Sequence, residues 1–167
     1  MIEKFKTLLF VRSSLISLYL ALTIPIPFIV SDKLKILSTV MFIFGFLLIL
    51  NITSDYVETY KKKIVYKTSF LAEIFGKKSW EICWKDITSI KSVSTSQGSK
   101  VYYFITNRDE SFLVPQRIDN FEKFISIIER NTKSNIDGMS YISPLWTYKI
   151  LTYISSFMII GELIAYL

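Results

Sequence analysis

Few side chains in this 167-residue sequence are equipped for catalysis, and the residue that most enzyme sites use is missing. The chain has no histidine, which is the usual general base near neutral pH. It has one cysteine, Cys83, so Ser-His-Asp and Cys-His triads, Cys/His zinc sites and an internal disulfide are all excluded. We therefore expect a protein that is not an enzyme and holds no cofactor and no metal.

The remaining polar residues do not form a catalytic pattern. Asp86, Asp109 and Glu110 fall at expected strand ends and turns, where turn chemistry favours acidic residues without any catalytic role. Nothing beside Cys83 in the sequence indicates a nucleophile. The five glycines form no phosphate-binding loop. We assign no catalytic or cofactor-binding residue.

Two charged residues interrupt a long apolar stretch at residues 144–167. An acid inside a membrane span indicates by default a proton site or an ion pair, so Glu162 is a candidate intramembrane polar contact. It lies close to one end of the stretch, where hydration is cheap, and this second interpretation stays open. Lys149 is one turn into the stretch and can extend its ammonium group to the interface.

Lysines form the densest charged run, and they are candidate contacts for lipid headgroups. The run is followed by three further lysines, and the full set is Lys61, Lys62, Lys63, Lys67, Lys77 and Lys78. The alternative is a solvated basic flank of a membrane helix. The basic excess of the whole segment is too diffuse to indicate nucleic acid binding.

Three apolar stretches are long enough to cross a bilayer. No charge occurs between Arg12 and Asp32 or between Lys35 and Asp55, and each gap holds nineteen residues, close to the ~20 that a spanning helix needs. We expect helices at about residues 7–28 and 36–53, joined by a short polar connector into a hairpin, and a third at 144–167. Gly45 is an expected close-packing point between the first two helices.

A more polar segment at residues 55–133 alternates in the manner of half-buried strands. Trp80, Ile82 and Trp84 share one side of an extended chain. Further strands are expected, among them Ile64–Ile74, Val101–Thr106 and Ser111–Val114. The expected total for the segment is about six strands. One amphipathic helix follows, capped by Asp119, with an apolar stripe that consists of Phe121, Phe124, Ile125 and Ile128. Residues 134–143 are expected to be a linker, and residues 1–54 the hairpin.

The run from Ser79 to Ile90, with its Trp84-Lys85-Asp86-Ile87 core, resembles a segment of bacterial pleckstrin-homology-like (PH-like) membrane proteins. The likeness covers about residues 56–133. It implies a small β-barrel capped by one C-terminal helix, here placed between a transmembrane hairpin and a third transmembrane helix. A hairpin followed by such a domain is also similar to thylakoid membrane proteins that assist photosystem I assembly, from which the third span departs.

The distribution of basic residues predicts an orientation. Lys4, Lys6 and Arg12 precede the hairpin and Lys61–Lys63 follow it, and cytoplasmic flanks are enriched in such residues. We expect the N-terminus and the polar domain on the cytoplasmic side of a bacterial plasma membrane or thylakoid, and the C-terminus on the far side. Lys33 and Lys35 in the connector oppose this assignment but are outnumbered.

These observations favour a non-catalytic, membrane-anchored interaction module that serves as an accessory or assembly subunit of a membrane protein complex, with a photosynthetic complex as a special case. Membrane lipids and another integral membrane protein are the expected partners. Tyr102 and Phe104 are a candidate partner surface. An anionic-lipid-binding or lipid-sensing protein and a small transporter or membrane enzyme component stay open as alternatives.

Overall fold

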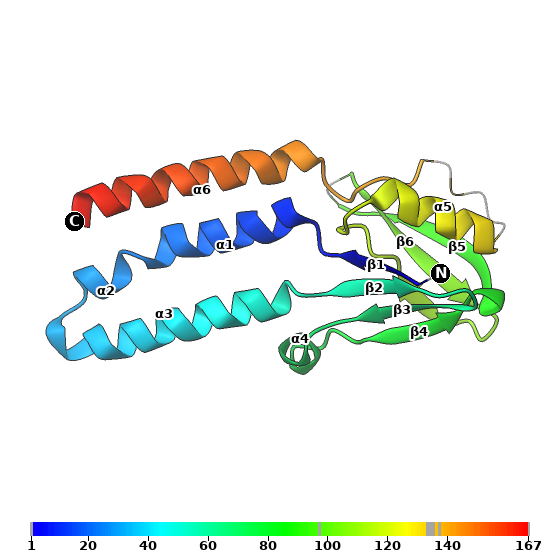
Figure 1. The fold of residues 1–167 in the computed structure, drawn as a ribbon, viewed down its shortest axis with the longest axis horizontal. Coiled ribbons are helices and arrows are strands. Elements are labelled where there is room, and N and C mark those ends of the chain that lie inside the picture. The colour runs from blue at the N-terminus through cyan, green and yellow to red at the C-terminus, as the bar shows by residue number, and fades with distance from the viewer. Residues whose placement is uncertain (1, 97, 133–135, 137, 167) are drawn as a thin grey trace. The chain divides into compact units, whose positions relative to one another are not determined.

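The structure is a computed structural model that describes residues 2–96, 98–132, 136 and 138–166. It divides into two compact units (Figure 1). The helical unit consists of Leu9–Ser54 and Pro144–Leu167, and the mixed unit consists of Met1–Leu8 and Asp55–Ser143. Each unit therefore combines segments that are distant in the sequence.

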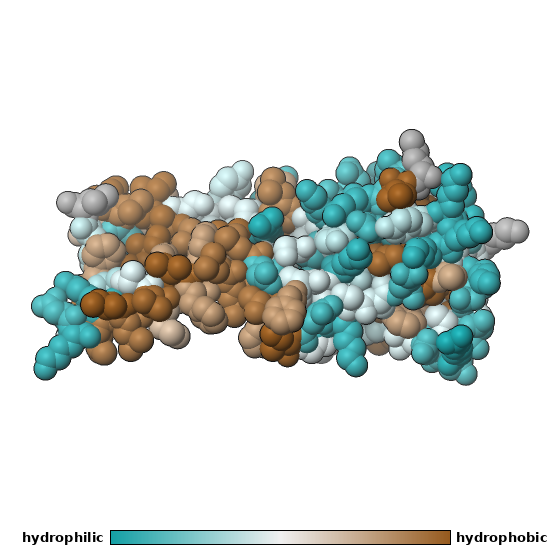
Figure 2. Space-filling view, turned by 60° about the horizontal axis from the view of Figure 1, so that its bottom comes forward, coloured by the Kyte–Doolittle hydropathy of each residue, from teal (hydrophilic) through white to brown (hydrophobic). Residues whose placement is uncertain are grey.

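The helical unit contains three helical segments that are long and apolar enough to span a membrane: Leu9–Ile29, Asp32–Ile52 and Leu145–Tyr166. These helices lie where the three apolar spans are expected from the sequence, and Figure 2 shows the apolar side chains that cover this unit. The first segment is broken into α1 (Leu9–Thr23) and α2 (Ile26–Ile29), because Pro25 starts a new helix. The other two are α3 (Asp32–Ile52) and α6 (Leu145–Tyr166). Helix α3 begins earlier than expected, at the connector residue Asp32, whose carboxylate pairs with Lys35 at 2.8 Å.

Small side chains form the contact between α1 and α6, and α1 lies between α6 and α3 (Figure 1). Ser14 and Ser155 are each only 1% exposed, and the hydroxyls of Ser13 and Thr152 are 3.5 Å apart. Small residues allow helix backbones to approach closely where lipid offers no hydrophobic drive for association. The packing of this unit therefore depends on shape and on short hydroxyl side chains.

Gly45 of α3 leaves room for Tyr19 of α1, as the sequence predicts. A Cβ atom at Gly45 would lie 3.0 Å from Cζ of Tyr19 and closer still to its hydroxyl. That hydroxyl donates a 2.7 Å hydrogen bond to the carbonyl oxygen of Phe42. The tyrosine is thus held against the helix surface that the glycine exposes.

We expect Gly45→Ala to destabilise the helical unit by about 1–3 kcal/mol, because the added methyl group overpacks the site and pushes Tyr19 away from Phe42. Gly161→Ala is the matched control, since a Cβ at that α6 glycine meets no atom within 4 Å. Thermal unfolding of both variants in the same detergent measures the difference. Equal melting temperatures for the two variants would contradict this packing.

The described residues of the mixed unit form two antiparallel sheets. The first has the order β1-β2-β3-β4, and the second has the order β5-β6-β7. The strands of the first sheet are β1 (Glu3–Lys6), β2 (Tyr56–Thr59), β3 (Lys63–Lys67) and β4 (Trp80–Cys83). Those of the second are β5 (Ile87–Ser94), β6 (Lys100–Thr106) and β7 (Ser111–Leu113). Within the described residues no ladder joins the sheets, so the expected closed barrel is not found. The chain turns between them at the short 3₁₀ helix η1 (Trp84–Asp86).

Strand β1 corrects the expected extent of the hairpin, residues 1–54, because residues 1–8 belong to the mixed unit. It pairs with β2 through Glu3↔Thr59 to Lys6↔Tyr56, although the whole of α1, α2 and α3 lies between them in the sequence. The N-terminal segment was expected only to flank a helix, because four residues of mixed polarity give a weak strand signal. The hairpin is therefore an insertion between two neighbouring strands of one sheet.

Two further segments differ from the expectations. The predicted strand Ile64–Ile74 ends at Lys67 and is followed by helix α4 (Phe70–Ile74), whose N-terminus is capped by the Ser69 hydroxyl. In the expected linker 134–143, residues 134, 135 and 137 lie outside the described residues, as does residue 133. The described part is not a linker, because Ile136 and Met139 are buried in the core.

Helix α5 (Phe121–Thr132) packs its apolar stripe on the core, as predicted. Phe121, Phe124 and Ile128 are buried, and Ile125 packs against them. The Asp119 carboxylate, expected to cap this helix, instead accepts a 2.9 Å hydrogen bond from the backbone N–H of Lys6 in β1. Asp119 thus ties the entry of α5 to the first strand.

Candidate functional site

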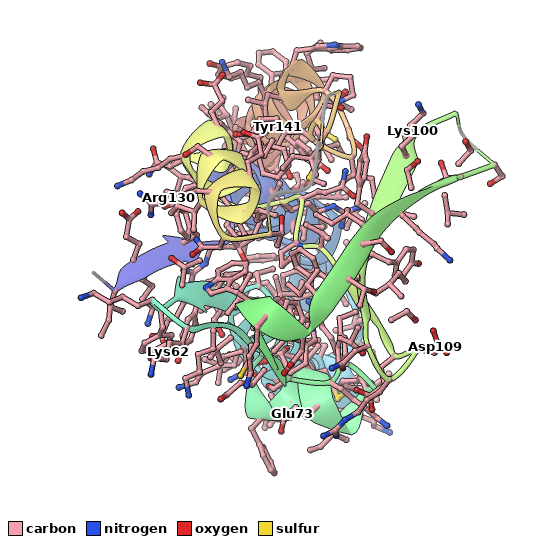
Figure 3. All side chains as sticks on the ribbon, turned by 90° about the vertical axis from the view of Figure 1, so that its right-hand side faces the viewer. Lys62, Glu73, Lys100, Asp109, Arg130 and Tyr141 are labelled. Carbon is pink, nitrogen blue, oxygen red and sulfur yellow. The ribbon has the colours of Figure 1, made fainter. Side chains whose placement is uncertain are left out.

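The six candidate lysines do not form one site. Strands β2 and β3 are antiparallel, and their register places Lys67 opposite Tyr56 at the base of the pair. Lys61 and Lys62 lie in the turn at the other end, and Figure 3 labels Lys62 there. The two groups are separated by the length of the strands, roughly 3.3 Å for each residue. Lys67, Lys77 and Lys78 form the basal group, and Lys61–Lys63 form the turn group.

The turn group belongs to a hydrogen-bonded turn, in which Tyr60 donates its N–H to the carbonyl oxygen of Lys63 at 2.8 Å. The indole of Trp84 donates a 2.9 Å hydrogen bond to the carbonyl of Tyr60, and Lys63 pairs with Glu81 at 2.8 Å. The hydrogen bond from Lys63 to Glu81 raises the pKa of the lysine. The charge of Lys63 is thus paired with a carboxylate, which weakens the case for headgroup binding by this lysine.

One lysine of the basal group, Lys77, contacts a buried carboxylate, Asp55, that the sequence analysis did not single out. The side chain of Asp55 accepts hydrogen bonds from Tyr66 Oη at 2.9 Å and Thr68 Oγ1 at 2.7 Å. It also pairs with the Lys77 ammonium group. Its backbone carbonyl accepts from the N–H of Thr7 at 3.1 Å and from the Thr7 hydroxyl at 3.0 Å. We call these five residues the Asp55 cluster.

The Asp55 cluster joins the two chain segments that connect the mixed unit to the hairpin. Thr7 lies two residues before α1, and Asp55 lies three residues after the end of α3. Tyr66 and Thr68 bind Asp55 from the end of β3, and Lys77 binds it from the loop before β4. No single stretch of sequence carries these residues, so only the paired strands bring them together.

Burial and the neighbouring Asp55 carboxylate raise the pKa of Tyr66. The folded state therefore holds this proton more tightly than the unfolded state, whose tyrosine titrates near its ordinary value of about 10. The stabilisation that results is complete below that value and is lost as the pH rises above it.

We expect the stability of the mixed unit to fall above about pH 10, and to fall less steeply in Tyr66→Phe, which has no proton to lose at this position. Urea unfolding of both proteins at pH 8 and at pH 11 measures the two differences. Lysines and other tyrosines titrate in both proteins and cancel in the comparison. An identical alkaline loss in the two proteins would contradict a role for Tyr66.

Tyr102 and Phe104 are not a partner surface, and this prediction is wrong. Phe104 is 0% exposed and packs edge-on against Trp80 with 6.0 Å between ring centroids. Tyr102 is buried, and its hydroxyl donates a 3.1 Å hydrogen bond to the carbonyl of Gly138. Both residues lie on the face of β6 that the core covers, so alternation along the strand, rather than aromatic character, decides their role.

Strand β5 presents a long unpaired edge. Val114 donates its N–H to the carbonyl of Tyr102 at 2.8 Å, so the backbone groups of Tyr102 face β7. Ser92 lies opposite Tyr102 in the ladder. When the N–H and C=O of one residue point away from its partner strand in an antiparallel ladder, those of the residue opposite also point away from that pair. The backbone N–H and C=O of Ser92 therefore face outward, away from β6. No described residue hydrogen-bonds to this outer edge, which we call the β5 edge.

The β5 edge differs from the other strand edges in length and in charge. Strand β5 has eight residues, whereas β1 and β4 have four and β7 has three. Lys91 is its only charged residue, and Val93 is 51% exposed. Figure 3 shows β5 and β6 as a long ribbon with Lys100 near its far end. Proteins usually shorten or charge such edges to prevent pairing, and this edge is neither short nor strongly charged.

The remaining candidate residues lie apart from one another and do not form a common site. Glu162 lies in the last turns of α6, and its Oε2 atom has no hydrogen-bond partner among the described residues. Lys149 lies over the ring of Phe10 at 5.0 Å. Cys83 is half-buried at the end of β4. In the part of the chain that the structure describes, no three Cys, Asp or Glu residues are grouped to hold a metal ion.

The chain is similar to a cyanobacterial protein. The chain is 27% identical over 161 residues to the uncharacterized protein slr0269 of Synechocystis sp., covering 93% of this chain and 80% of that protein. No family model matches the chain. No solved structure matches it either.

Proposed function

We propose that this chain is a non-catalytic, membrane-anchored interaction module, an accessory or assembly subunit that binds another membrane protein through the β5 edge. An unpaired strand edge recognises an extended segment of a partner by forming the next strand of the sheet. The observation that carries the proposal is the eight-residue β5 edge with a single charge.

The layout of the mixed unit supports this assignment. Antiparallel strands followed by one amphipathic helix, α5, are the arrangement that the resemblance to PH-like membrane proteins implies. Such a unit offers an exposed sheet edge and needs no catalytic group. The absence of histidine from the sequence points in the same direction. The cyanobacterial origin of the similar protein is in keeping with a photosynthetic complex as the partner.

The proposal includes a topology. Strands β1 and β2 pair with each other, so the chain segments before and after the hairpin lie on one side of the membrane, together with the β5 edge. The basic residues on both flanks favour the cytoplasmic side for this unit. Three spans then place the end of α6 on the opposite side.

Ser92→Pro tests the proposal, because proline removes an outward-facing N–H while leaving the β5–β6 hydrogen bonds in place. The full chain is extracted from its native membrane in a mild detergent, and the co-purifying membrane protein is quantified. We expect the wild type to retain a stoichiometric partner and Ser92→Pro to lose it. Lys62→Gln, in the turn between β2 and β3, is the matched control and should retain the partner.

Two results would contradict the proposal. A wild-type chain that elutes alone from the native membrane would argue against any stable partner. A Ser92→Pro chain that keeps the same partner in the same amount would show that the β5 edge does not bind it. Circular dichroism of the variant must match that of the wild type. A match shows that β5 is still folded, so that a lost partner is explained by the missing N–H at the edge.

A further inference from the structure

Helix α4 exposes a group of large apolar side chains that the proposed partner site does not use. Phe70 is 73% exposed, Ile74 is 64% exposed and Phe75 is 68% exposed. The opposite side of the helix faces the unit through Ala72, which is buried. A contiguous apolar group of this kind on a polar unit indicates a contact with an apolar phase or a partner.

The Asp55 cluster links α4 to the chain segment that follows α3. Thr68 immediately precedes the Ser69 cap of α4, and Lys77 follows the helix by three residues. Both side chains bind Asp55. Asp55 lies three residues beyond Ile52, the end of the candidate span α3, and three residues reach at most about 11 Å. Both ends of α4 are therefore tied to a point close to the end of a span.

The polar surroundings of α4 suit the headgroup layer of a membrane. Lys67 and Lys78 are exposed, and Lys78 makes no ion pair with any described residue. Glu73 of α4 accepts a 2.7 Å hydrogen bond from the Ser79 hydroxyl, and Figure 3 labels it on this helix. Amphipathic helices with Phe or Leu on one face and lysines on the other bury their apolar face about 5–10 Å into the boundary between headgroups and acyl chains.

We propose that α4 is a membrane-surface anchor whose Phe70, Ile74 and Phe75 side chains insert into the lipid next to the end of α3. The occupant of this surface is the bilayer itself. The anchor would hold the mixed unit at a fixed tilt, in addition to the covalent connections through Leu8, Asp55 and Ser143. The turn group at Lys61–Lys63, at the other end of β2 and β3, would lie away from the lipid.

Site-specific labelling of the full chain tests this proposal. Cys83→Ser removes the native thiol, and Phe70→Cys, Ile74→Cys or Lys62→Cys then introduces one labelling position on an exposed side chain. Each protein is labelled with an environment-sensitive fluorophore in vesicles of phosphatidylcholine and phosphatidylglycerol. Quenching is measured with brominated acyl chains and with aqueous iodide.

We expect the labels at positions 70 and 74 to be quenched by brominated lipid and to be several-fold less sensitive to iodide than the label at position 62. Iodide quenching at 70 and 74 equal to that at 62 would overturn the proposal. Protection from both quenchers would also overturn it, because it would show that protein, such as a second copy of the chain, covers α4. Neither outcome bears on the β5 edge, whose test uses a different surface and a different readout.

Discussion

Asp55→Ala is expected to destabilise the mixed unit by about 3–5 kcal/mol, because Tyr66 and Thr68 lose a charged acceptor worth about 1.5–3 kcal/mol each. Lys77 contributes less, since its side chain is 45% exposed and can be hydrated when its partner is removed. A loss of this size is a large part of the total stability of a small domain. Urea unfolding of the full chain in detergent, followed by tryptophan fluorescence, measures it.

The reporter and the control for this measurement come from the chain itself. Trp80 and Trp84 lie at the core of the mixed unit, and Trp146→Phe removes the tryptophan of the helical unit. Glu81→Gln is the matched control, since it breaks the exposed pair with Lys63 and should cost no more than about 1 kcal/mol. Equal effects of the two substitutions would show that Asp55 does not organise the base of the sheet.

Phe104→Ala is expected to destabilise the same unit by about 3–5 kcal/mol, through lost burial and the cavity left behind. This ring is 0% exposed and contacts Trp80. The result separates two interpretations of the aromatic strand β6. A partner-surface residue would reduce binding and leave stability unchanged, whereas a core residue reduces stability first.

Leu113→Ala is the control for Phe104→Ala. Leu113 lies on β7, next to β6, and is 50% exposed, so its truncation should change the unfolding free energy by less than about 1 kcal/mol. The two variants are compared by the urea titration used for Asp55. Stability close to that of the wild type in Phe104→Ala would contradict the packing of the core.

The sequence predicts best those parts of the structure that a strong local pattern determines. The charge-free gaps before Asp32 and before Asp55 predict the first two long apolar helices, because a helix of that length without charge is suited to hydrocarbon. The stripe through Phe121 and Ile128 predicts the buried face of α5. Gly45 predicts the close contact in the hairpin, since a missing side chain has few other uses inside a span.

The parts that depend on distant residues could not be predicted from the sequence. The four residues of β1 are a strand only because β2 lies beside them after a long insertion. Asp55 gains its role from Thr7, Tyr66 and Lys77, which no local pattern connects. The Phe70–Ile74 segment has the apolar content of a strand but forms a helix, whose first turn is capped by the Ser69 hydroxyl.

The central claim is that the three apolar helices cross a membrane and that the mixed unit, including β1, lies on one side of it. Single cysteines at exposed positions Ile2, Lys33, Lys62 and Tyr166, in a Cys83→Ser background, are treated with a membrane-impermeant thiol reagent in sealed vesicles of uniform orientation. We predict that positions 2 and 62 react from one side, and that positions 33 and 166 react only from the other. Reaction of position 33 from the same side as position 62 would contradict the account, because the hairpin would then not span the bilayer.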